Sequence, residues 1–506
     1  MDLAGDALRV TELIGSLSLA ADLGTGQPLG HGLSTGLLAV TLAAGTGCDP
    51  ERLRAVQQVA MLRFIGCTSD AGDLAREAGT DDVAFSAAFA PVFSGRPREG
   101  LQVMFANVGS GQSLARRTTL LARLLTDTGG MARSMASHCE VASMLAVRLG
   151  LGTDVSNALA HAYERWDGKG YPDGLEGEEI PFEVRVAVVA RDADLFARLG
   201  EDVAAKLEAR RGRAYDPAVV DTYLSLRPPH EEADWQAVLD TEPHPVAYVD
   251  DIDRALTAIA HFADLKSTWT RGHSPRVAEL AHQAGHIAGE DGETCGRLRR
   301  AGLVHDVGRV GIGNHIWDKP GPLATAEWEQ VRLHPYHTER VLSRCAALAH
   351  LGALACSHHE RLDGSGYPRQ TAALTAETNI LAAADMLAAL TADRPHRPGL
   401  TLEDAVAVLT ADAEHGRLDR RAVSHVIEAA GLPPTHSGTE NPAGLTDREV
   451  EVLRLLAGGS TNRQVGDSLF ISPKTVGRHV ENIYSKIGVS TRAGAAVFAM
   501  EHRLLG

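Results

Sequence analysis

The chain contains 506 residues, of which 44% are hydrophobic and 23% charged, and its formal net charge is −16. At about 150 residues per domain this length predicts about three domains rather than one core. The acidic balance excludes a chain that binds nucleic acid over its whole surface, and the absence of any apolar run of about 18 residues excludes a membrane-spanning helix.

The N-terminus and the cysteines indicate a cytoplasmic protein. Asp2 and Asp6 stand where a secretory signal would be basic. The six cysteines are scattered and form no Cys-x-x-Cys pair, as expected of reduced thiols in a reducing compartment. We therefore expect a cytoplasmic location and no membrane partner.

Apolar residues recur mainly at helical spacing. Val277, Leu280, Ala284 and Ile287 follow the 3.6-residue period of a helix, and few segments alternate in the way of a strand. We predict an all-α chain. The alternative places a short strand pair in the stretch between residues 64 and 137.

A conspicuous motif in the N-terminal half is followed by a second copy. Residues 163–172 read Tyr-Glu-Arg-Trp-Asp-Gly-Lys-Gly-Tyr-Pro, and residues 359–368 read His-Glu-Arg-Leu-Asp-Gly-Ser-Gly-Tyr-Pro. His31 also precedes Arg63 by 32 positions, as His273 precedes His305. A match of this length in one frame predicts an internal duplication.

The second copy carries paired metal-ligand residues. Adjacent residues such as His305-Asp306 and His358-His359 point about 100° apart on a helix, which suits two ions better than one. Two ions about 3.5–4 Å apart could be held from both sides and share a bridging hydroxide, an arrangement that predicts phosphoester hydrolysis. The candidate ligands, which suit Fe, Mn or Zn, are His273, His305, Asp306, His334, His358, His359 and Asp385.

With these motifs in this order, residues 248–430 resemble an HD-GYP domain, a branch of the HD phosphohydrolases similar to cyclic di-GMP phosphodiesterases. The resemblance implies two divalent metal ions, with Fe or Mn expected, and a cyclic dinucleotide or a related phosphoester as substrate. It implies that His305, Asp306 and Arg309 are catalytic. The substrate-binding positions that it implies are Arg309, Gly364, Gly366, Tyr367, Pro368, Arg394 and Arg397.

Three positions depart from the family pattern. Arg309 replaces a lysine, which keeps the charge but changes its shape. Trp269 stands where trinuclear members carry a glutamate, so two metals are expected rather than three. His396 replaces a tyrosine near the expected substrate, which leaves the identity of the phosphoester open.

The first copy, residues 1–226, has lost most of this chemistry. Of the seven ligand positions only His31 and His138 keep a ligand residue. The replacements are Arg63, Phe64, Ala162 and Tyr163, and the position of Asp385 falls on or beside Arg191, with Asp192 one residue further on. Because added positive charge repels cations, we predict a metal-free pseudo-domain, whose role as a nucleotide sensor, a partner of the active copy or a dimer face stays open. The interval from Arg63 to His138 is 75 residues long and contains an insertion that could act as a lid or sensor.

Residues 442–506 resemble a LuxR-type helix-turn-helix domain. Thr446 with Glu449, and Thr461 with Gln464, predict two capping boxes that begin helices, and Ser472-Pro473 predicts the start of a recognition helix over residues 474–487. Its core side should carry Val476, Val480, Ile483 and Ile487. The residues expected to contact DNA are Thr461, Asn462, Lys474, Thr475, Arg478, His479 and Asn482.

Charge and family resemblance together indicate double-stranded DNA as a partner. Residues 445–506 contain eight Lys or Arg and six Asp or Glu, a net +2, which leaves −18 on the remainder of a chain whose total is −16. DNA affinity must therefore come from this domain. One module makes few phosphate contacts, and the fourth helix commonly serves dimerisation in this family, so we expect a homodimer.

The leading hypothesis is a DNA-binding transcriptional regulator with a two-metal cyclic dinucleotide phosphodiesterase domain. One alternative is a transcription factor that senses metal or nucleotide without catalysis. Another is an HD phosphohydrolase of a different phosphoester. Linkers are expected at residues 227–232 and 431–444, which are rich in proline and polar residues.

Overall fold

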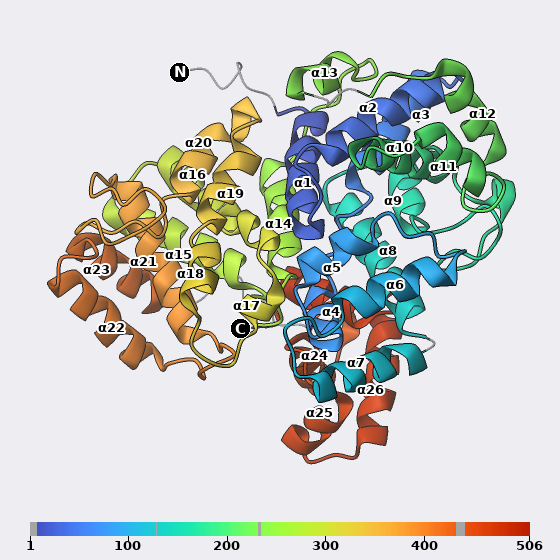
Figure 1. Ribbon diagram of the computed structural model, residues 1–506. Coiled ribbons are helices and arrows are strands. Elements are labelled where there is room, and N and C mark those ends of the chain that lie inside the picture. The colour runs from blue at the N-terminus through green and yellow to red at the C-terminus, as the bar shows by residue number, and fades with distance from the viewer. Residues whose placement is uncertain (1–7, 128, 231–233, 432–440, 506) are drawn as a thin grey trace. The chain divides into compact units, whose positions relative to one another are not determined.

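The computed structural model describes residues 8–127, 129–230, 234–431 and 441–505 (Figure 1). This part of the chain contains helices and isolated backbone bridges but no strand, so the all-α prediction is confirmed and the alternative strand pair is wrong. No helix within these ranges is both long enough and apolar enough to cross a membrane. Most of the two expected linkers, residues 231–232 and 432–440, lies outside the described residues.

The chain divides into two compact units, Met1–Ala255 and Leu256–Gly506. The helices up to the boundary are α1 (Val10–Thr25), α2 (His31–Ala44), α3 (Pro50–Leu62), α4 (Ala71–Ala78), α5 (Asp82–Phe89), α6 (Pro97–Asn107), α7 (Leu114–Thr126), α8 (Gly130–Arg148), α9 (Thr153–Ala160), η1 (Gly177–Glu179), α10 (Phe182–Arg198), α11 (Val203–Arg210), α12 (Pro217–Leu226) and α13 (Trp235–Asp240).

Helix α14 (Ile252–Asp264) crosses the boundary between the units. The helices that follow it are α15 (His273–Ala288), α16 (Gly292–Val304), η2 (Val307–Gly311), α17 (Asn314–Trp317), α18 (Thr325–Val331), α19 (His334–Leu342), α20 (Ala346–Ala355), α21 (Ala376–Thr391), α22 (Leu402–Glu414), α23 (Arg420–Gly431), η3 (Pro442–Gly444), α24 (Asp447–Ala457), α25 (Asn462–Leu469), α26 (Pro473–Ile487) and α27 (Arg492–Glu501).

The two units share the helix pair that begins each repeat. Helices α2 and α15 both start on a histidine, His31 or His273, directly after a glycine with a φ of 94° or 82°. Only glycine adopts such an angle without strain, so the chain turns sharply and directs the first helical residue inward. Each histidine is consequently buried at the start of its helix.

The second helix of each pair places the next motif position. Helices α3 and α16 are both 13 residues long, and both begin after an aspartate, Asp49 or Asp291, whose side chain accepts a hydrogen bond from the third residue on. They end immediately before Arg63 and His305 respectively. The duplication predicted from motif spacing is thus also present in the helix boundaries.

In both units the backbone closely approaches another helix three residues after Arg63 or His305. A Cβ on Gly66 would lie 2.0 Å from the carbonyl oxygen of His138, and a Cβ on Gly308 would lie 2.2 Å from that of His334. No side chain fits at either distance. These glycines let the chain after α3 or α16 contact the helix that carries the next histidine.

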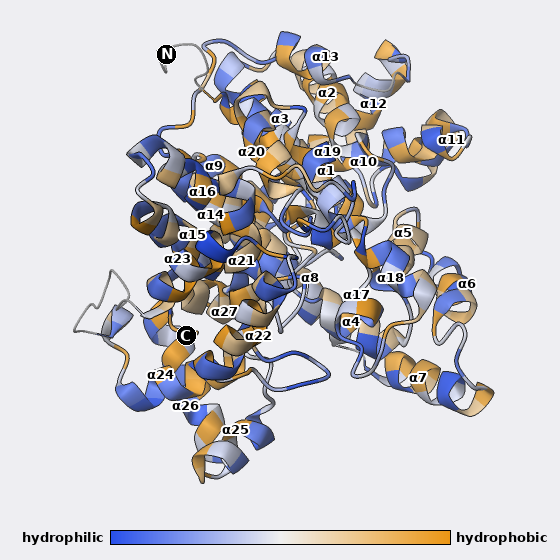
Figure 2. Ribbon diagram, turned by 90° about the vertical axis from the view of Figure 1, so that its left-hand side faces the viewer, coloured by the Kyte–Doolittle hydropathy of each residue, from blue (hydrophilic) through white to orange (hydrophobic). Residues whose placement is uncertain are grey.

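The insertion of the first unit is helical and has its own small core. Its buried residues, Ala78, Phe85, Val108 and Leu120, come from α4, α5, the end of α6 and α7. Figure 2 shows hydrophobic and hydrophilic residues interleaved along α6 and α7, as expected of helices packed on one side only. The proposed role as a lid or sensor stays a prediction.

The C-terminal helices begin as their sequence predicts. Both expected capping boxes are formed, at α24 and α25, and Ser472 caps α26 with proline at its first position. Val476 and Ile483 are buried in α26. Val480 and Ile487, which we expected in the core, are half-buried because they lie at the edges of the packed face.

Two glycines of the second unit, Gly308 and Gly296, have contrasting surroundings and provide a stability test. Gly308→Ala should lower the free energy of unfolding by about 1–3 kcal/mol, because the new methyl group meets the backbone of α19. Gly296→Ala, within α16 and with nothing within 4 Å of the new atom, should raise it by about 0.5–1 kcal/mol. Urea denaturation of both variants checks this, and equal changes would contradict the packing described.

Candidate metal centre

Three buried imidazoles of the second unit are oriented in the same way. His305, His334 and His358 each donate Nδ1–H to the carbonyl oxygen three residues earlier, at 2.7, 2.6 and 2.6 Å. In the neutral ring this bond leaves the lone pair on Nε2, which is the arrangement usual for metal-ligating histidines. In the neutral form that binds a metal ion, all three Nε2 atoms face the interior of the site as acceptors. Asp306 and Asp385 nevertheless raise the pKa of His305 well above its usual value, despite its burial.

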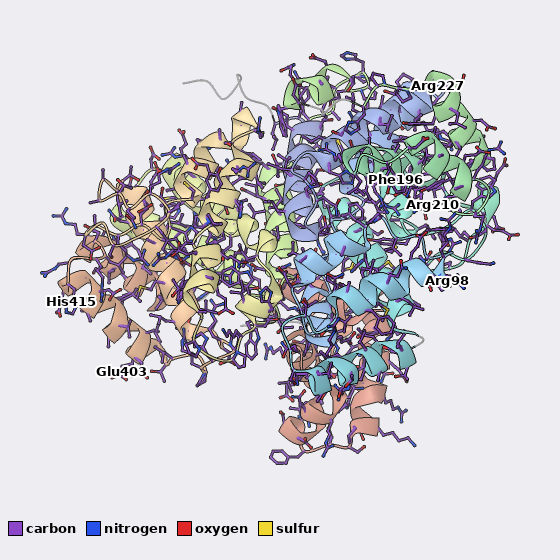
Figure 3. The ribbon with its side chains drawn as sticks, in the orientation of Figure 1. Arg98, Phe196, Arg210, Arg227, Glu403 and His415 are labelled. Atoms are coloured by element: carbon purple, nitrogen blue, oxygen red, sulfur yellow. The ribbon has the colours of Figure 1, made fainter. Side chains whose placement is uncertain are left out.

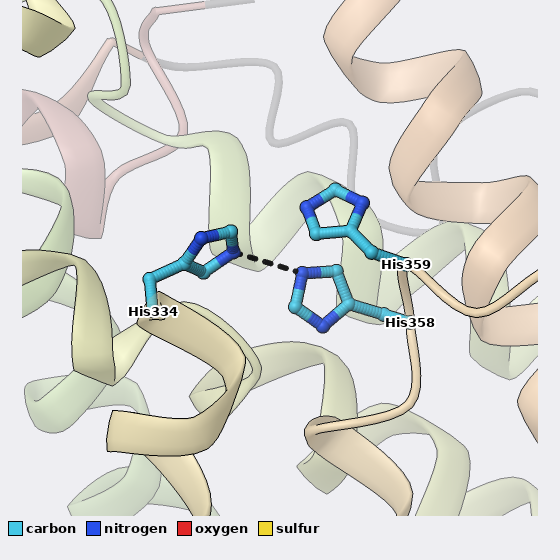
Figure 4. Close-up of side chains that lie close together, drawn as sticks. All are labelled: His334, His358 and His359. Atoms are coloured by element: carbon cyan, nitrogen blue, oxygen red, sulfur yellow. Dashed lines mark hydrogen bonds between the residues drawn. The ribbon is translucent and has the colours of Figure 1, made fainter. Parts of the chain in front are cut away.

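Two of these acceptors face each other. Nε2 of His334 lies 3.3 Å from Nε2 of His358, and His359 is beside them (Figure 4). Two lone pairs at this distance repel unless a cation lies near both. These three histidines bring their ring nitrogens within 4.8 Å of one another, as a shared metal ion requires.

Asp306 lies between this group and a second one. Its Oδ1 is 3.3 Å from His334 Nε2 and 3.7 Å from His358 Nε2. Its Oδ2 is 3.4 Å from His305 Nε2 and 3.7 Å from His273 Nε2. Asp306 thus directs one carboxylate oxygen at His334 and His358 and the other at His273 and His305.

Asp385, on α21, makes a similar connection on the other side. Its Oδ1 lies 3.1 Å from His273 Nε2 and 3.6 Å from His305 Nε2, and its Oδ2 lies 3.8 Å from His359 Nδ1. The structure therefore brings all seven predicted ligand positions together. Their donor set of imidazoles and carboxylates fits divalent ions of the Mn, Fe or Zn type.

The electrostatics of the site keep its carboxylates charged and several imidazoles neutral. Burial would raise the pKa of Asp306, but Arg309 and His305 hold it well below its usual range. Burial and the neighbouring His305 lower the pKa of His358 to about 3, and burial with His358 lowers that of His359. Charged carboxylates and neutral imidazoles are the forms that bind metal ions.

The predicted substrate-binding arginines differ in their surroundings. Arg309 donates to Asp306 Oδ2 at 2.7 Å and stacks on Trp317 with its Cζ 3.9 Å from the ring centre. Arg394 donates to the carbonyl oxygen of Trp269 at 3.3 Å, and burial together with the positive charge of Arg309 lowers the pKa of Arg394 to about 10. Arg397 instead donates to the carbonyls of Ala389 and Leu390 and so caps α21.

The Gly-x-Gly-Tyr-Pro loop folds back onto the histidine pair. A Cβ on Gly366 would lie 2.5 Å from His359 O, so this position requires glycine, whereas Gly364 has a φ of 76°. The Tyr367 ring lies 4.6 Å from the His359 ring, and Pro368 follows it in the half-buried part of the loop. Tyr367 is therefore placed beside a candidate ligand.

Two buried carboxylates of the second unit were missed by the sequence reading. Glu360 accepts hydrogen bonds from the N–H groups of Arg369 and Thr371 and so ties the loop to the histidine pair. Asp264 accepts from the N–H and the hydroxyl of Ser274, next to His273. The signal available was repetition, because Glu164 and Asp22 occupy the matching positions of the first copy.

The matching place in the first unit is cationic. Arg63 is 5% exposed, and its Cζ lies 5.2 Å from the Tyr163 ring centre. Arg191 occupies the position of Asp385 and pairs with its neighbour Asp192 at 2.8 Å. Only His31 and His138 remain of the ligand set, and both are bonded to carboxylates outside it, Asp194 and Asp70, at 2.5 and 2.6 Å.

The model of the HD domain family matches residues 126–219 and 258–422, which together are more than half of the chain. The chain belongs to the HD domain family. It is accordingly a metal-dependent phosphohydrolase, as predicted. The two matched segments agree with the internal duplication, and a model of bacterial regulatory proteins of the luxR family matches residues 443–499.

Similar HD proteins include cyclic dinucleotide phosphodiesterases. The 3′3′-cGAMP-specific phosphodiesterase 3 of Vibrio cholerae is 29% identical over 86% of this chain and 97% of that protein. The crystal structure of the V. cholerae cyclic GMP-AMP-specific phosphodiesterase V-cGAP3 covers 85% of this chain and 99% of its own, with a TM-score of 0.58 and 26% identity.

The transcriptional regulatory protein LiaR of Bacillus subtilis is 40% identical over 106 residues, 20% of this chain and 48% of LiaR.

The expected DNA-contacting residues lie at the surface of the luxR-type domain. Thr461 caps α25, and α26 carries the basic positions. The exposed members of the set are Thr461, Lys474, Thr475, Arg478 and Asn482, and the half-buried members are Asn462 and His479. This placement fits a recognition helix, and the contacts themselves stay a prediction.

The buried Asp22 of the first HD domain predicts a pH dependence. Burial raises the pKa of Asp22 to about 8, against about 3.9 in an unfolded chain. The folded state therefore binds the extra proton, so this contribution to stability is complete below about pH 4 and is lost as the pH rises toward 8.

In Asp22→Asn the fall in the free energy of unfolding between pH 5 and pH 8 should be smaller than in the native protein by roughly 3–4 kcal/mol. Urea denaturation at both pH values measures it. Asp154→Asn, at an exposed position of α9, is the matched control and should leave the fall unchanged. An identical fall in Asp22→Asn and native protein would contradict the burial argument.

Proposed function

We propose that this protein is a transcriptional regulator that binds DNA through its luxR-type domain and hydrolyses a cyclic dinucleotide in its second HD domain with two divalent metal ions. The observation that carries this proposal is the position of Asp306, whose two oxygens face separate sets of histidine Nε2 atoms. A carboxylate placed in this way suits two ions side by side.

We assign the two ions to two ligand sets that share the Asp306 carboxylate. The set formed by His273, His305, Asp306 and Asp385 would hold one ion, and the set formed by Asp306, His334, His358 and His359 would hold the other. When bound, the ions would lower the pKa of water and neutralise charge on the phosphoryl oxygens. His305 and Asp306 would then be catalytic as ligands.

Arg309 and Arg394 would receive the phosphodiester. Asp306 and the face of Trp317 hold the Arg309 side chain in one orientation. Its remaining N–H donors could therefore bind a phosphate without a further loss of side-chain freedom. Arg394 adds a second positive charge, and the charge of Arg309 lowers the pKa of Arg394. Both arginines would orient the phosphate and offset its charge, and Tyr367 would line the same side.

The substrate class rests on the similar proteins. Relatives are specific for 3′3′-cGAMP or act on cyclic di-GMP, and the relative matched over nearly its whole length is specific for 3′3′-cGAMP. We therefore propose a cyclic dinucleotide, with cyclic di-GMP and 3′3′-cGAMP as the two candidates. We further propose a homodimer, which doubles the phosphate contacts to DNA.

Turnover by the purified full chain tests the catalytic part. With Mn²⁺ or Fe²⁺ the native protein should convert one of the two nucleotides to a linear dinucleotide or to mononucleotides. Chromatography of the reaction mixture measures these products. Asp306→Ala removes the shared carboxylate, so metal affinity and turnover should both fall by at least about 100-fold. His415→Ala, at an exposed histidine directly after the end of α22 (Figure 3), should change neither.

Absence of turnover of any cyclic dinucleotide by metal-loaded native protein would contradict the catalytic proposal. If metal or nucleotide then shifted the affinity for DNA without any product, the second HD domain would be a sensor instead. Turnover of a different phosphoester alone would contradict only the assignment of the substrate.

Salt dependence of DNA binding tests the recognition helix. Lys474→Ala should weaken binding to all sequences alike, and should reduce the slope of log affinity against log salt by about 1 for each copy that contacts DNA. Fluorescence anisotropy at several salt concentrations measures the slope. Arg420→Ala, an exposed position on α23, should leave the slope unchanged, and an unchanged slope in Lys474→Ala would contradict a phosphate contact.

A further inference from the structure

The first HD domain holds cations where the second holds metal ligands. Arg63 occupies the position of His305, at the end of α3, and Arg191 occupies the position of Asp385, on α10. Their Cζ atoms lie 5.9 and 5.7 Å from the centre of the same ring, that of Phe64. A site that receives cations in one copy has therefore reversed its charge in the other.

Arg63 is buried without the partners that a buried guanidinium requires. It is 5% exposed, and its Nε and Nη1 atoms have no hydrogen-bond acceptor among the described residues. No carboxylate within the described ranges lies within 4 Å of it, and its contacts are the faces of Phe64 and Tyr163. A buried charge without a counter-ion is costly, so a group that supplies acceptors would be bound favourably.

The cations beside Arg63 each have an acidic partner of their own. Arg191 is offset by Asp192. His138 also contacts Tyr163, with ring centres 5.8 Å apart, and Asp70 at 2.6 Å raises the pKa of His138 well above the usual value despite burial. The Asp70 carboxylate offsets His138, so Arg63 is the cation that remains without an acidic partner.

The loop that covers the metal centre in the second copy is retained around this cluster. Glu164 accepts hydrogen bonds from the N–H groups of Asp173 and Gly174, as Glu360 does from the matching loop of the second copy. The glycine position is also kept, because a Cβ on Gly170 would lie 2.3 Å from Arg165 N. The first copy thus keeps the enclosure and replaces only the charge inside it.

We propose that the first HD domain binds a phosphoryl oxyanion at the cluster of Arg63, Arg191 and His138. A phosphate group offers several acceptor oxygens and a full negative charge, which match the unpartnered guanidinium nitrogens of Arg63. The ligand is an inorganic phosphate or the phosphate of a nucleotide. Binding there involves no metal and no hydrolysis, so the site is independent of the function proposed for the second HD domain.

Thermal unfolding of the full chain, freed of metal with EDTA, tests this site. At constant ionic strength, replacing chloride by inorganic phosphate, GMP or cyclic di-GMP should raise the unfolding temperature of the native protein by roughly 2–4 °C or more for at least one of them. A response to phosphate itself identifies a free anion site, and a response to a nucleotide alone identifies a nucleotide site.

Arg63→Met should abolish this response and, in chloride, should unfold at a higher temperature than the native protein, because an uncompensated buried charge is removed. Arg98→Met, an exposed arginine on α6 (Figure 3), should respond as the native protein does. If Arg63→Met does not fold, Arg63→Lys keeps the charge but loses the planar fork and should show a weakened response. No response of the native protein to any of the three anions, or an undiminished response in the Arg63 variants, would overturn the proposal.

Discussion

Each HD domain buries charged side chains in its interior, where water cannot offset their charge and neighbouring groups must do so. In the second domain, imidazole Nε2 atoms are directed inward by hydrogen bonds from Nδ1 to helix carbonyls, and Asp306 and Asp385 are charged among them. Lone pairs and carboxylates that are buried together require cations. The helix starts, the close glycine contacts and the folded-back loop all serve to hold these groups within reach of one another.

The duplication separates this scaffold from its chemistry. Both copies keep an inward histidine at a helix start, a glycine pressed against the next helix and a glutamate that ties the loop. What differs is the set of side chains inside, where a histidine and an aspartate of the second copy are replaced by Arg63 and Arg191. The scaffold therefore does not by itself determine whether the site receives a cation.

The order and spacing of motifs predicted the fold class and the group of residues that meet at the candidate site. These predictions succeeded because helix starts, caps and ligand pairs are local patterns, as at Thr446 and Ser472. The hydrogen-bond roles of individual side chains outside the helix starts and ligand pairs were not predictable in this way. Asp264 lies nine residues before His273 without any motif around it, and Arg397 caps α21 although its sequence context favours a phosphate contact.

Anomalous diffraction from crystals of the full chain grown with Mn²⁺ would test the central claim most directly. The account predicts two manganese peaks in the second HD domain, one on each side of the Asp306 carboxylate, and none beside Arg63 in the first. A single peak remote from Asp306, or manganese bound in the first domain, would contradict it.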